Sequence, residues 1–233
     1  MTLLEAKTGL EAKTGVLPLA QRKLWPLLRA AADLGFVLYG GTAIALRLGH
    51  RASVDFDFFT DREADRDILR QALPFLAGAT TLRDRPDEFT ASVGARARSV
   101  KLSFFSRIRH GRIDKPDRTA DGVLLVASLD DLMATKLKTI LQRSAVRDYQ
   151  DIAAMIAANV DLANGLAGAR ALYGPSFQPS ESLKALTYFA DGDLDQLPMA
   201  ARKLLIGAAS SVDRLPKRRI VSRRLAIRAA PAK

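Results

Sequence analysis

The stretch GGTAIALRLGHRASVDFDFFT, residues 40–60, decides the fold. The apolar run before it, residues 36–39, predicts a strand. The two glycines predict a turn, and Thr42 is expected to cap the helix that follows, to about residue 48. Residues 54–59 predict a second strand. The sequence therefore predicts a strand, a glycine turn, a helix and a strand that carries two acids.

Asp55 and Asp57 are the sharpest feature of this stretch. Side chains at i and i+2 of a strand point to the same side, so both carboxylates lie on one face, with Phe56 and Phe58 on the other. Two such charges repel each other and are costly to bury, and a divalent cation relieves that cost. Magnesium suits the site because it prefers oxygen ligands shared with substrate phosphates.

The glycine turn predicts a phosphate cradle beside this metal site. Glycine lets a backbone approach a phosphate closely, and the helix N-terminus after the turn offers free N–H groups and positive potential. Either half alone is a weak signal, since glycine turns and exposed Asp pairs are common. Together, at this spacing, they predict a nucleotide and metal site.

Outward from this stretch, the pattern predicts an α/β (α+β) fold, a small mixed sheet flanked by helices and followed by a C-terminal helical lobe. Further strands are expected at residues 80–85, 88–93, 100–105 and 123–126, and helices at 18–34, 62–76, 129–141, 148–158, 162–172, 181–189 and 199–209. The expected domains are a flexible N-terminal extension (1–17, containing a tandem LEAKTG), a core (18–126), a helical lobe (127–210) and a basic tail (211–233).

Composition narrows the class. There are no cysteines and only two histidines, which argues against disulfides and against thiolate or histidine-rich zinc sites. No apolar run is long enough to cross a membrane and no secretory signal is visible, so we expect a cytoplasmic protein with no membrane partner. The net charge is +11, and residues 211–233 carry eight Lys/Arg and one Asp. Such a tail is either a solvated end or a segment that binds polyanions such as RNA. Residues 95–112, with six Lys/Arg and no acid, are either a basic cleft wall or an exposed hairpin.

A second group of polar residues lies in the helical part. Lys136 and Arg143 are seven residues apart and share a helix face. Arg147, Asp148 and Asp151 follow. These residues alone fit a charged outer face with helix ion pairs as well as they fit a site.

The two groups together resemble the AbiEii/AbiGii toxin family of nucleotidyltransferases, in the polymerase-beta-like superfamily. GGTAIALRLGHRASVDFDFFT is similar to that family's glycine–Ser/Thr turn and D-x-D strand, and KLKTILQRSAVRDYQDI, residues 136–152, to its lysine–arginine helix and R-D-x-x-D. LKALTYFADGD, residues 183–193, is a softer likeness. The resemblance covers about residues 20–210.

The resemblance implies roles for individual residues. Gly40, Gly41 and Thr42 would bind the triphosphate, and Asp55 and Asp57 would bind Mg²⁺. Lys136 would contact phosphate and stabilise charge, and Asp148 would orient or deprotonate an acceptor hydroxyl. Arg143, Arg147 and Asp151 would support the substrate or the shape of the site.

One position departs from the superfamily pattern. Relatives often carry a third carboxylate on a later strand, and Ser103 stands at the best candidate position here. Asp148 then supplies the base, or the metal site is weaker, or catalysis has been lost. We favour the first explanation.

The function implied by the resemblance is that of a toxin in a toxin–antitoxin or phage-defence system. It would transfer a nucleoside monophosphate from an NTP to an acceptor hydroxyl, with RNA, at a tRNA 3′ end, as the expected acceptor and a cognate antitoxin as the expected partner. The rivals are a nucleotidyltransferase acting on a small molecule or a protein, and an inactive homologue that only binds nucleotide or RNA.

Overall fold

The computed structural model describes residues 9–95 and 98–227. Its centre is a seven-stranded mixed sheet in the order β3-β4-β5-β2-β1-β7-β6. The strands are β1 (Val37–Tyr39), β2 (Asp55–Phe59), β3 (Thr80–Arg85), β4 (Glu88–Val93), β5 (Val100–Phe105), β6 (Asp117–Arg118) and β7 (Leu125–Val126). The two-residue strand β6 escaped prediction, whereas the β3 to β5 ranges agree with it.

The strand β2 lies at the middle of the sheet, and its two faces have different chemistry. Phe56 and Phe58 are fully buried, and Phe58 stacks on Phe104 of β5 with ring centroids 5.1 Å apart. β2 pairs antiparallel with β1 and parallel with β5, and Asp57 stands opposite both Tyr39 and Ser103. The register therefore sets the acidic face of β2 beside the polar face of β5.

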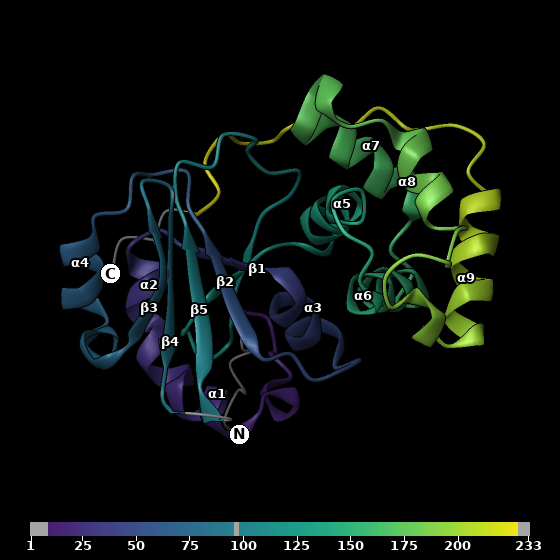
Figure 1. Cartoon of the computed structure of the whole chain (residues 1–233). Coiled ribbons are helices and arrows are strands. Elements are labelled where there is room, and N and C mark those ends of the chain that lie inside the picture. The colour runs from purple at the N-terminus through teal and green to yellow at the C-terminus, as the bar shows by residue number, and fades with distance from the viewer. Residues whose placement is uncertain (1–8, 96–97, 228–233) are drawn as a thin grey trace, which may run out of the picture.

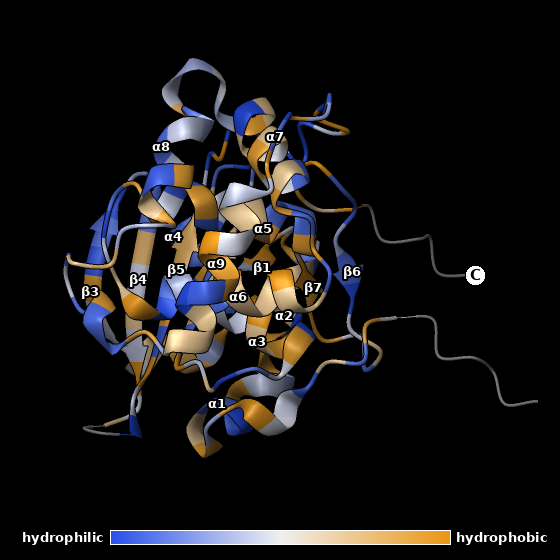
Figure 2. Ribbon diagram, turned by 90° about the vertical axis from the view of Figure 1, so that its right-hand side faces the viewer, coloured by the Kyte–Doolittle hydropathy of each residue, from blue (hydrophilic) through white to orange (hydrophobic). Residues whose placement is uncertain are grey.

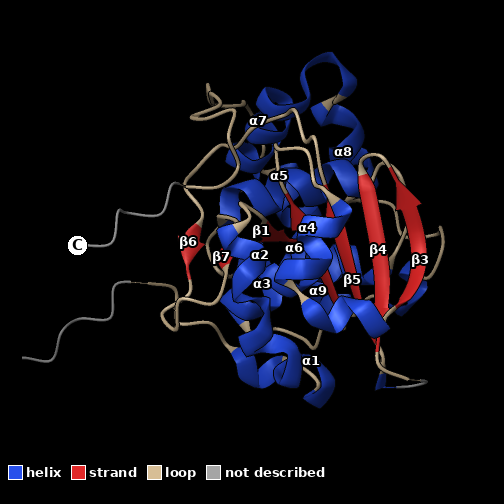
Figure 3. Cartoon of the chain, turned by 90° about the vertical axis from the view of Figure 1, so that its left-hand side faces the viewer, coloured by secondary structure: helices blue, strands red, loops and turns tan. Residues whose placement is uncertain are grey.

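Helices cover both sides of the sheet, as Figures 1 and 3 show. On one side lie α1 (Leu19–Leu24), α2 (Arg29–Asp33) and α4 (Arg66–Ala72); on the other lies α3 (Gly40–Leu48). The single helix expected over residues 18–34 is wrong. A 3-10 segment, Trp25–Leu28, separates α1 from α2, and Pro26 lies in it. Proline lacks the N–H that a continuous α-helix needs.

The helical lobe packs against α3. It contains α5 (Leu129–Thr139), α6 (Val146–Ala157), α7 (Leu162–Tyr173), α8 (Pro179–Ala185) and α9 (Met199–Ser210). Helices α5 and α6 both contact α3, and α7 packs on α5. Figure 2 shows hydrophobic and hydrophilic stretches following one another along the ribbons of these helices.

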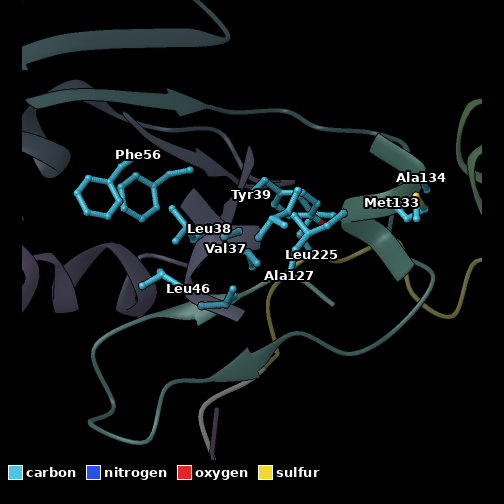
Figure 4. Packing of buried hydrophobic residues seen from close by; sticks show 14 of the residues in the cluster. Val37, Leu38, Tyr39, Leu46, Phe56, Ala127, Met133, Ala134 and Leu225 are labelled. Carbon is cyan, nitrogen blue, oxygen red and sulfur yellow. The ribbon is translucent and has the colours of Figure 1, made fainter. Parts of the chain in front are cut away.

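Both ends of the described chain are packed rather than free. Residues 9–17 do not form the flexible extension that we expected: Leu10 bridges to Thr119, and Leu17 is buried. The first LEAKTG copy lies outside the described residues, except Gly9. After α9, residues 211–227 run back to the sheet side, in yellow in Figure 1, and Leu225 joins the core seen in Figure 4. The apolar side chains spread along these segments explain why they pack.

The core is continuous from the sheet into the helical lobe. Figure 4 shows Val37, Leu38 and Phe56 of the sheet, Met133 and Ala134 of α5, and Leu225 among its members. Among the described residues, no helix combines the length and the apolar character that crossing a membrane requires.

Candidate active site

Two carboxylates project from β2 into a cleft between the sheet and the helical lobe. The cleft has a volume of about 700 Å³, and Asp55 and Asp57 line it together with Ser103 of β5 and with Lys136 and Asp148 of the helical lobe. The structure therefore brings both groups of predicted residues to one space.

The glycine turn lies against Asp57. Gly40 has φ +72°, and a Cβ placed there would lie 2.4 Å from Oδ2 of Asp57. At Gly41 a Cβ would lie 2.5 Å from a guanidinium nitrogen of Arg51. Gly40 therefore excludes a side chain, whereas at Gly41 a side chain would require Arg51 to move. Helix α3 begins at Gly40 with its N-terminal N–H groups beside the carboxylates.

Thr42 does not cap α3, and that prediction is wrong. The helix begins at Gly40, and Tyr39 is its N-cap without a side-chain bond. Thr42 is buried in the first turn, where its hydroxyl donates to the carbonyl of Asp55 and lies 2.9 Å from Oγ of Ser53. It is not among the residues that line the cleft. In this structure Thr42 ties α3 to the start of β2, whereas Gly40 and Gly41 face the cleft.

The helical side of the cleft carries a buried ion-pair network around Lys136. Its Nζ lies 2.5 Å from Oδ1 of Asp148 and 2.7 Å from Oδ2 of Asp151. Arg143 donates to Asp148 from Nε at 2.7 Å. Helices α5 and α6 bring these groups together, because Lys136 is in α5 and both acids are in α6. Interpreting Lys136, Asp148 and Asp151 as part of a charged outer face is therefore wrong, because all three are buried. The prediction that Arg143 shares a helix face with Lys136 is wrong too, because α5 ends at Thr139 and Arg143 lies in the loop after it.

Asp148 is ionised at neutral pH. Burial acts to raise its pKa, but the hydrogen bond from Arg143 and the charge of Lys136 outweigh burial and hold the pKa below its ordinary value. A carboxylate so strongly paired is a weak proton acceptor. Its geometry suits a positioning role better than a role as a base. Asp148 holds Lys136 and Arg143 towards the cleft, where they can contact a substrate.

Asp151 stands behind Lys136 instead of facing the cleft. It accepts from Nε and Nη2 of Arg51 at 2.7 and 2.8 Å, and Nε2 of His50 lies 2.7 Å away. Arg147 lines the cleft and is exposed. Sequence reasoning missed Arg51, whose only signal was a basic residue between the glycine turn and the D-x-D strand.

Lys101 is a second residue that sequence reasoning missed. Its Nζ lies 2.9 Å from Oδ2 of Asp55, which stands opposite it in the β2–β5 register. The available signal was its spacing of two from Ser103, which puts both side chains on the same strand face.

Burial dominates the electrostatics of Asp57. It raises the pKa, and the negative charge of Asp55 adds to the rise. Lys101, Lys136 and a hydrogen bond with the Ser103 hydroxyl act in the opposite direction without cancelling it. Ser103 thus stands beside Asp57, where a third acid would increase the repulsion further.

The carboxylate pair fits magnesium. Within the described residues, no group of three or more His, Asp or Glu side chains is placed to hold a metal ion, so the protein offers two carboxylates. Magnesium is commonly held by one or two carboxylates, with water and substrate phosphates completing its shell. A cation would also relieve the repulsion that raises the pKa of Asp57.

Comparisons with known proteins give a family and one sequence relative. A family model described as the nucleotidyl transferase AbiEii toxin of a type IV toxin–antitoxin system matches residues 23–216. An uncharacterized protein of Aquifex aeolicus is 30% identical over 119 residues, which cover 50% of this chain and 55% of that protein. The chain thus matches little more than half the length of that relative.

Solved structures give two further comparisons, of which MenT4 is similar in fold. MenT4, a nucleotidyltransferase toxin from Mycobacterium tuberculosis H37Rv, has a TM-score of 0.57 and 16% identity, with 84% of each chain covered. The antibiotic-resistance factor ANT(2'')-Ia has a TM-score of 0.49 and 15% identity, with 71% of this chain and 94% of that chain covered. With the fold of such a transferase and a family match over most of its length, the chain belongs to the AbiEii nucleotidyltransferase toxin family of type IV toxin–antitoxin systems.

Proposed function

We propose that the protein transfers a nucleoside monophosphate from an NTP to a hydroxyl of RNA, with a tRNA 3′ end as the acceptor. The observation that carries the proposal is the meeting, in one cleft, of the β2 carboxylates, the Gly40-Gly41 turn and the cationic side chains of α5 and α6. Each of these suits one part of a triphosphate substrate.

The glycine turn is the part suited to the triphosphate. Free N–H groups at the start of α3 favour anionic oxygens, and Gly40 and Gly41 line the cleft without a side chain to cover their backbone. Lys136 and Arg143 then face the same cleft and stabilise negative charge on the departing pyrophosphate.

Asp55 and Asp57 are the part suited to Mg²⁺. When bound there, the ion supplies charge neutralisation on the phosphates and a lower pKa for an attacking oxygen. The two carboxylates lie on one strand and keep a fixed spacing, so they need little rearrangement on binding. Asp148 holds Lys136 and Arg143 and orients the acceptor hydroxyl.

An RNA acceptor is favoured by the basic surface of the chain. The net charge is +11, and polyanions bind such surfaces through their phosphates. The family context adds a cognate antitoxin as the expected protein partner.

The test is transfer of labelled nucleotide. We would incubate the protein with Mg²⁺, each α-labelled NTP and total RNA, and then separate RNA, protein and small molecules. The expected result is labelled RNA that is lost, by about 100-fold or more, in Asp55→Asn and in Lys136→Met. Asp33→Asn, on the exposed surface of α2, and Lys203→Met, on α9, are the matched controls and keep activity.

Label in protein or in a small molecule, with none in RNA, would contradict the proposed acceptor. No transfer to any fraction, with RNA binding intact, would contradict catalysis itself. Circular dichroism of each variant separates a lost site from a lost fold.

A further inference from the structure

Two basic segments, far apart in sequence, lie side by side. Residues 107–118 and 211–227 meet at Arg112, whose N–H donates to the carbonyl of Ser222 at 2.9 Å and whose carbonyl accepts from the N–H of Val221 at 3.0 Å. Nε of Arg112 also donates to the carbonyl of Arg224 at 3.0 Å. We call this paired surface, residues 107–118 and 211–227, the basic seam.

The basic seam holds most of the excess charge of the protein. It contains eleven Lys/Arg and three Asp, a net +8 within a chain of net +11. Eight of the cations are exposed. One of them, Arg107, pairs with Glu63, and in the described part of the chain none of the other seven forms an ion pair or a side-chain hydrogen bond. They are Arg109, Lys115, Arg214, Lys217, Arg219, Arg223 and Arg224. These groups are free to meet an external anion.

The seam is held in place by its own packing. Leu225 is buried in the core, and its N–H donates to Asp61 after β2 at 2.8 Å. Arg218 pairs with Asp130 at the start of α5. The backbone that carries the cations is therefore ordered before any partner arrives, which lowers the entropic cost of binding.

The chemistry of the seam selects the kind of partner. Neither segment contains Phe, Tyr or Trp, so the seam offers no aromatic platform on which bases could stack. Protein interfaces are enriched in aromatic residues and methionine, which the seam lacks; they are enriched in arginine too, so the absence of aromatic and methionine anchors is what sets the seam apart. Arginine and lysine in this density match the phosphates of a nucleic-acid backbone.

We propose that the basic seam binds the phosphodiester backbone of RNA, without reading its sequence. This inference rests on the proposed function only in that the RNA held there is the acceptor. The basic contact surface then lies in residues 107–118 and 211–227, and only partly in the 95–112 segment that the sequence suggested.

The experiment compares two triple variants of the full chain that lose the same charge. The seam variant is Lys217→Gln/Arg219→Gln/Arg223→Gln, and the control is Arg22→Gln/Lys23→Gln/Lys203→Gln, which changes exposed cations on α1 and α9. Fluorescence anisotropy measures binding of a labelled folded RNA hairpin, without NTP, over a range of salt concentrations.

For the seam variant we expect Kd to rise about tenfold or more, and the slope of log K against log salt to fall by about 2 to 3, one step for each lost phosphate contact. The control stays within about twofold of the wild type. Two hairpins of unrelated sequence give the same Kd within about threefold.

Equal weakening in both variants would overturn the inference, because net charge alone would then explain binding. So would unchanged binding in the seam variant, or binding of poly-L-glutamate as tight as that of RNA, which would indicate an acidic protein as the partner. Because NTP is absent, RNA binding through the seam in a protein that labels no RNA upholds this inference and refutes the proposed acceptor. If the seam variant still labels RNA and binds RNA with normal affinity, the proposed acceptor is upheld and the inference about the basic seam is refuted.

Discussion

A single side chain of the cleft, Lys101, acts on both carboxylates of β2. It pairs with Asp55 at 2.9 Å and also lowers the pKa of Asp57, which burial keeps above its ordinary value. One ammonium therefore moderates both carboxylates. A site with two acids and no third needs a smaller compensating charge than a three-acid site, and Lys101 supplies part of it.

Replacing Lys101 tests this moderation. In Lys101→Met the pKa of Asp57 rises further, since a cation that favours its charged form is gone. A carboxyl with a higher pKa keeps its proton to higher pH, so the acidic limb of the transfer rate moves to higher pH. The pH range over which Mn²⁺ binds, followed by electron paramagnetic resonance, also moves to higher pH. An acidic limb at the wild-type position, or an equal shift in Lys203→Met, would refute the role of Lys101.

At the scale of the elements, the ion-pair network fixes α6 to α5 and to the loop before β2. Asp151 of α6 contacts Arg51, His50 and Lys136, and its side chain is fully buried. Burial acts to raise the pKa of Asp151, but the hydrogen bond from His50, the charge of Lys136 and the contact with Arg51 hold it well below its ordinary value.

Asp151→Asn is therefore expected to destabilise the protein by about 3 to 5 kcal/mol at pH 7, because it leaves buried cations without their partner. The folded-state pKa of Asp151 is lowered, so its contribution is complete above the unfolded value of about 4 and is lost as pH falls through the folded value. Urea unfolding should show a gap between wild type and variant that narrows below pH 4. A gap that is independent of pH would contradict this account, and Asp33→Asn should stay within about 0.5 kcal/mol of wild type.

At the scale of the whole molecule, residues 211–227 tie the helical lobe to the sheet. The segment leaves α9 and places Leu225 in the common core, 1% exposed. It also forms backbone hydrogen bonds with Arg112 through Val221 and Ser222. The two parts of the protein are thus joined by the chain after α9 as well as by the contacts of α3 with α5 and α6.

Leu225→Ala should lower the free energy of unfolding by about 2 to 5 kcal/mol, the usual cost of emptying a buried leucine site. Leu215→Ala is the matched control on the same segment; that side chain is 37% exposed and should cost clearly less. Equal costs in urea unfolding would mean that the segment does not contribute to the core through Leu225.

The central strands and the likeness to the family can be predicted from local sequence patterns. The D-F-D-F alternation in residues 55–58 states which face of β2 is buried, because the period of a strand is two. Glycine in residues 40–41 predicts a change of chain direction, and α3 begins there with Gly40 at positive φ. The strands β3 to β5 are predicted by their local patterns. The likeness of residues 40–60 and 136–152 to the AbiEii family needed no coordinates.

The surroundings of the two acids depend on tertiary contacts. Arg51 and His50 belong to no local pattern, and the alternation that puts Lys101 on the face of Ser103 does not say that β2 lies beside it. All three reach the site through strand register and helix packing. Thr42 appeared to be a cap because local rules favour threonine there, but the helix starts two residues earlier and buries it against β2. The two ends of the described chain appeared loose because their few apolar residues are widely spaced. Their burial depends on surfaces that form only when distant segments meet, and no local periodicity records such contacts.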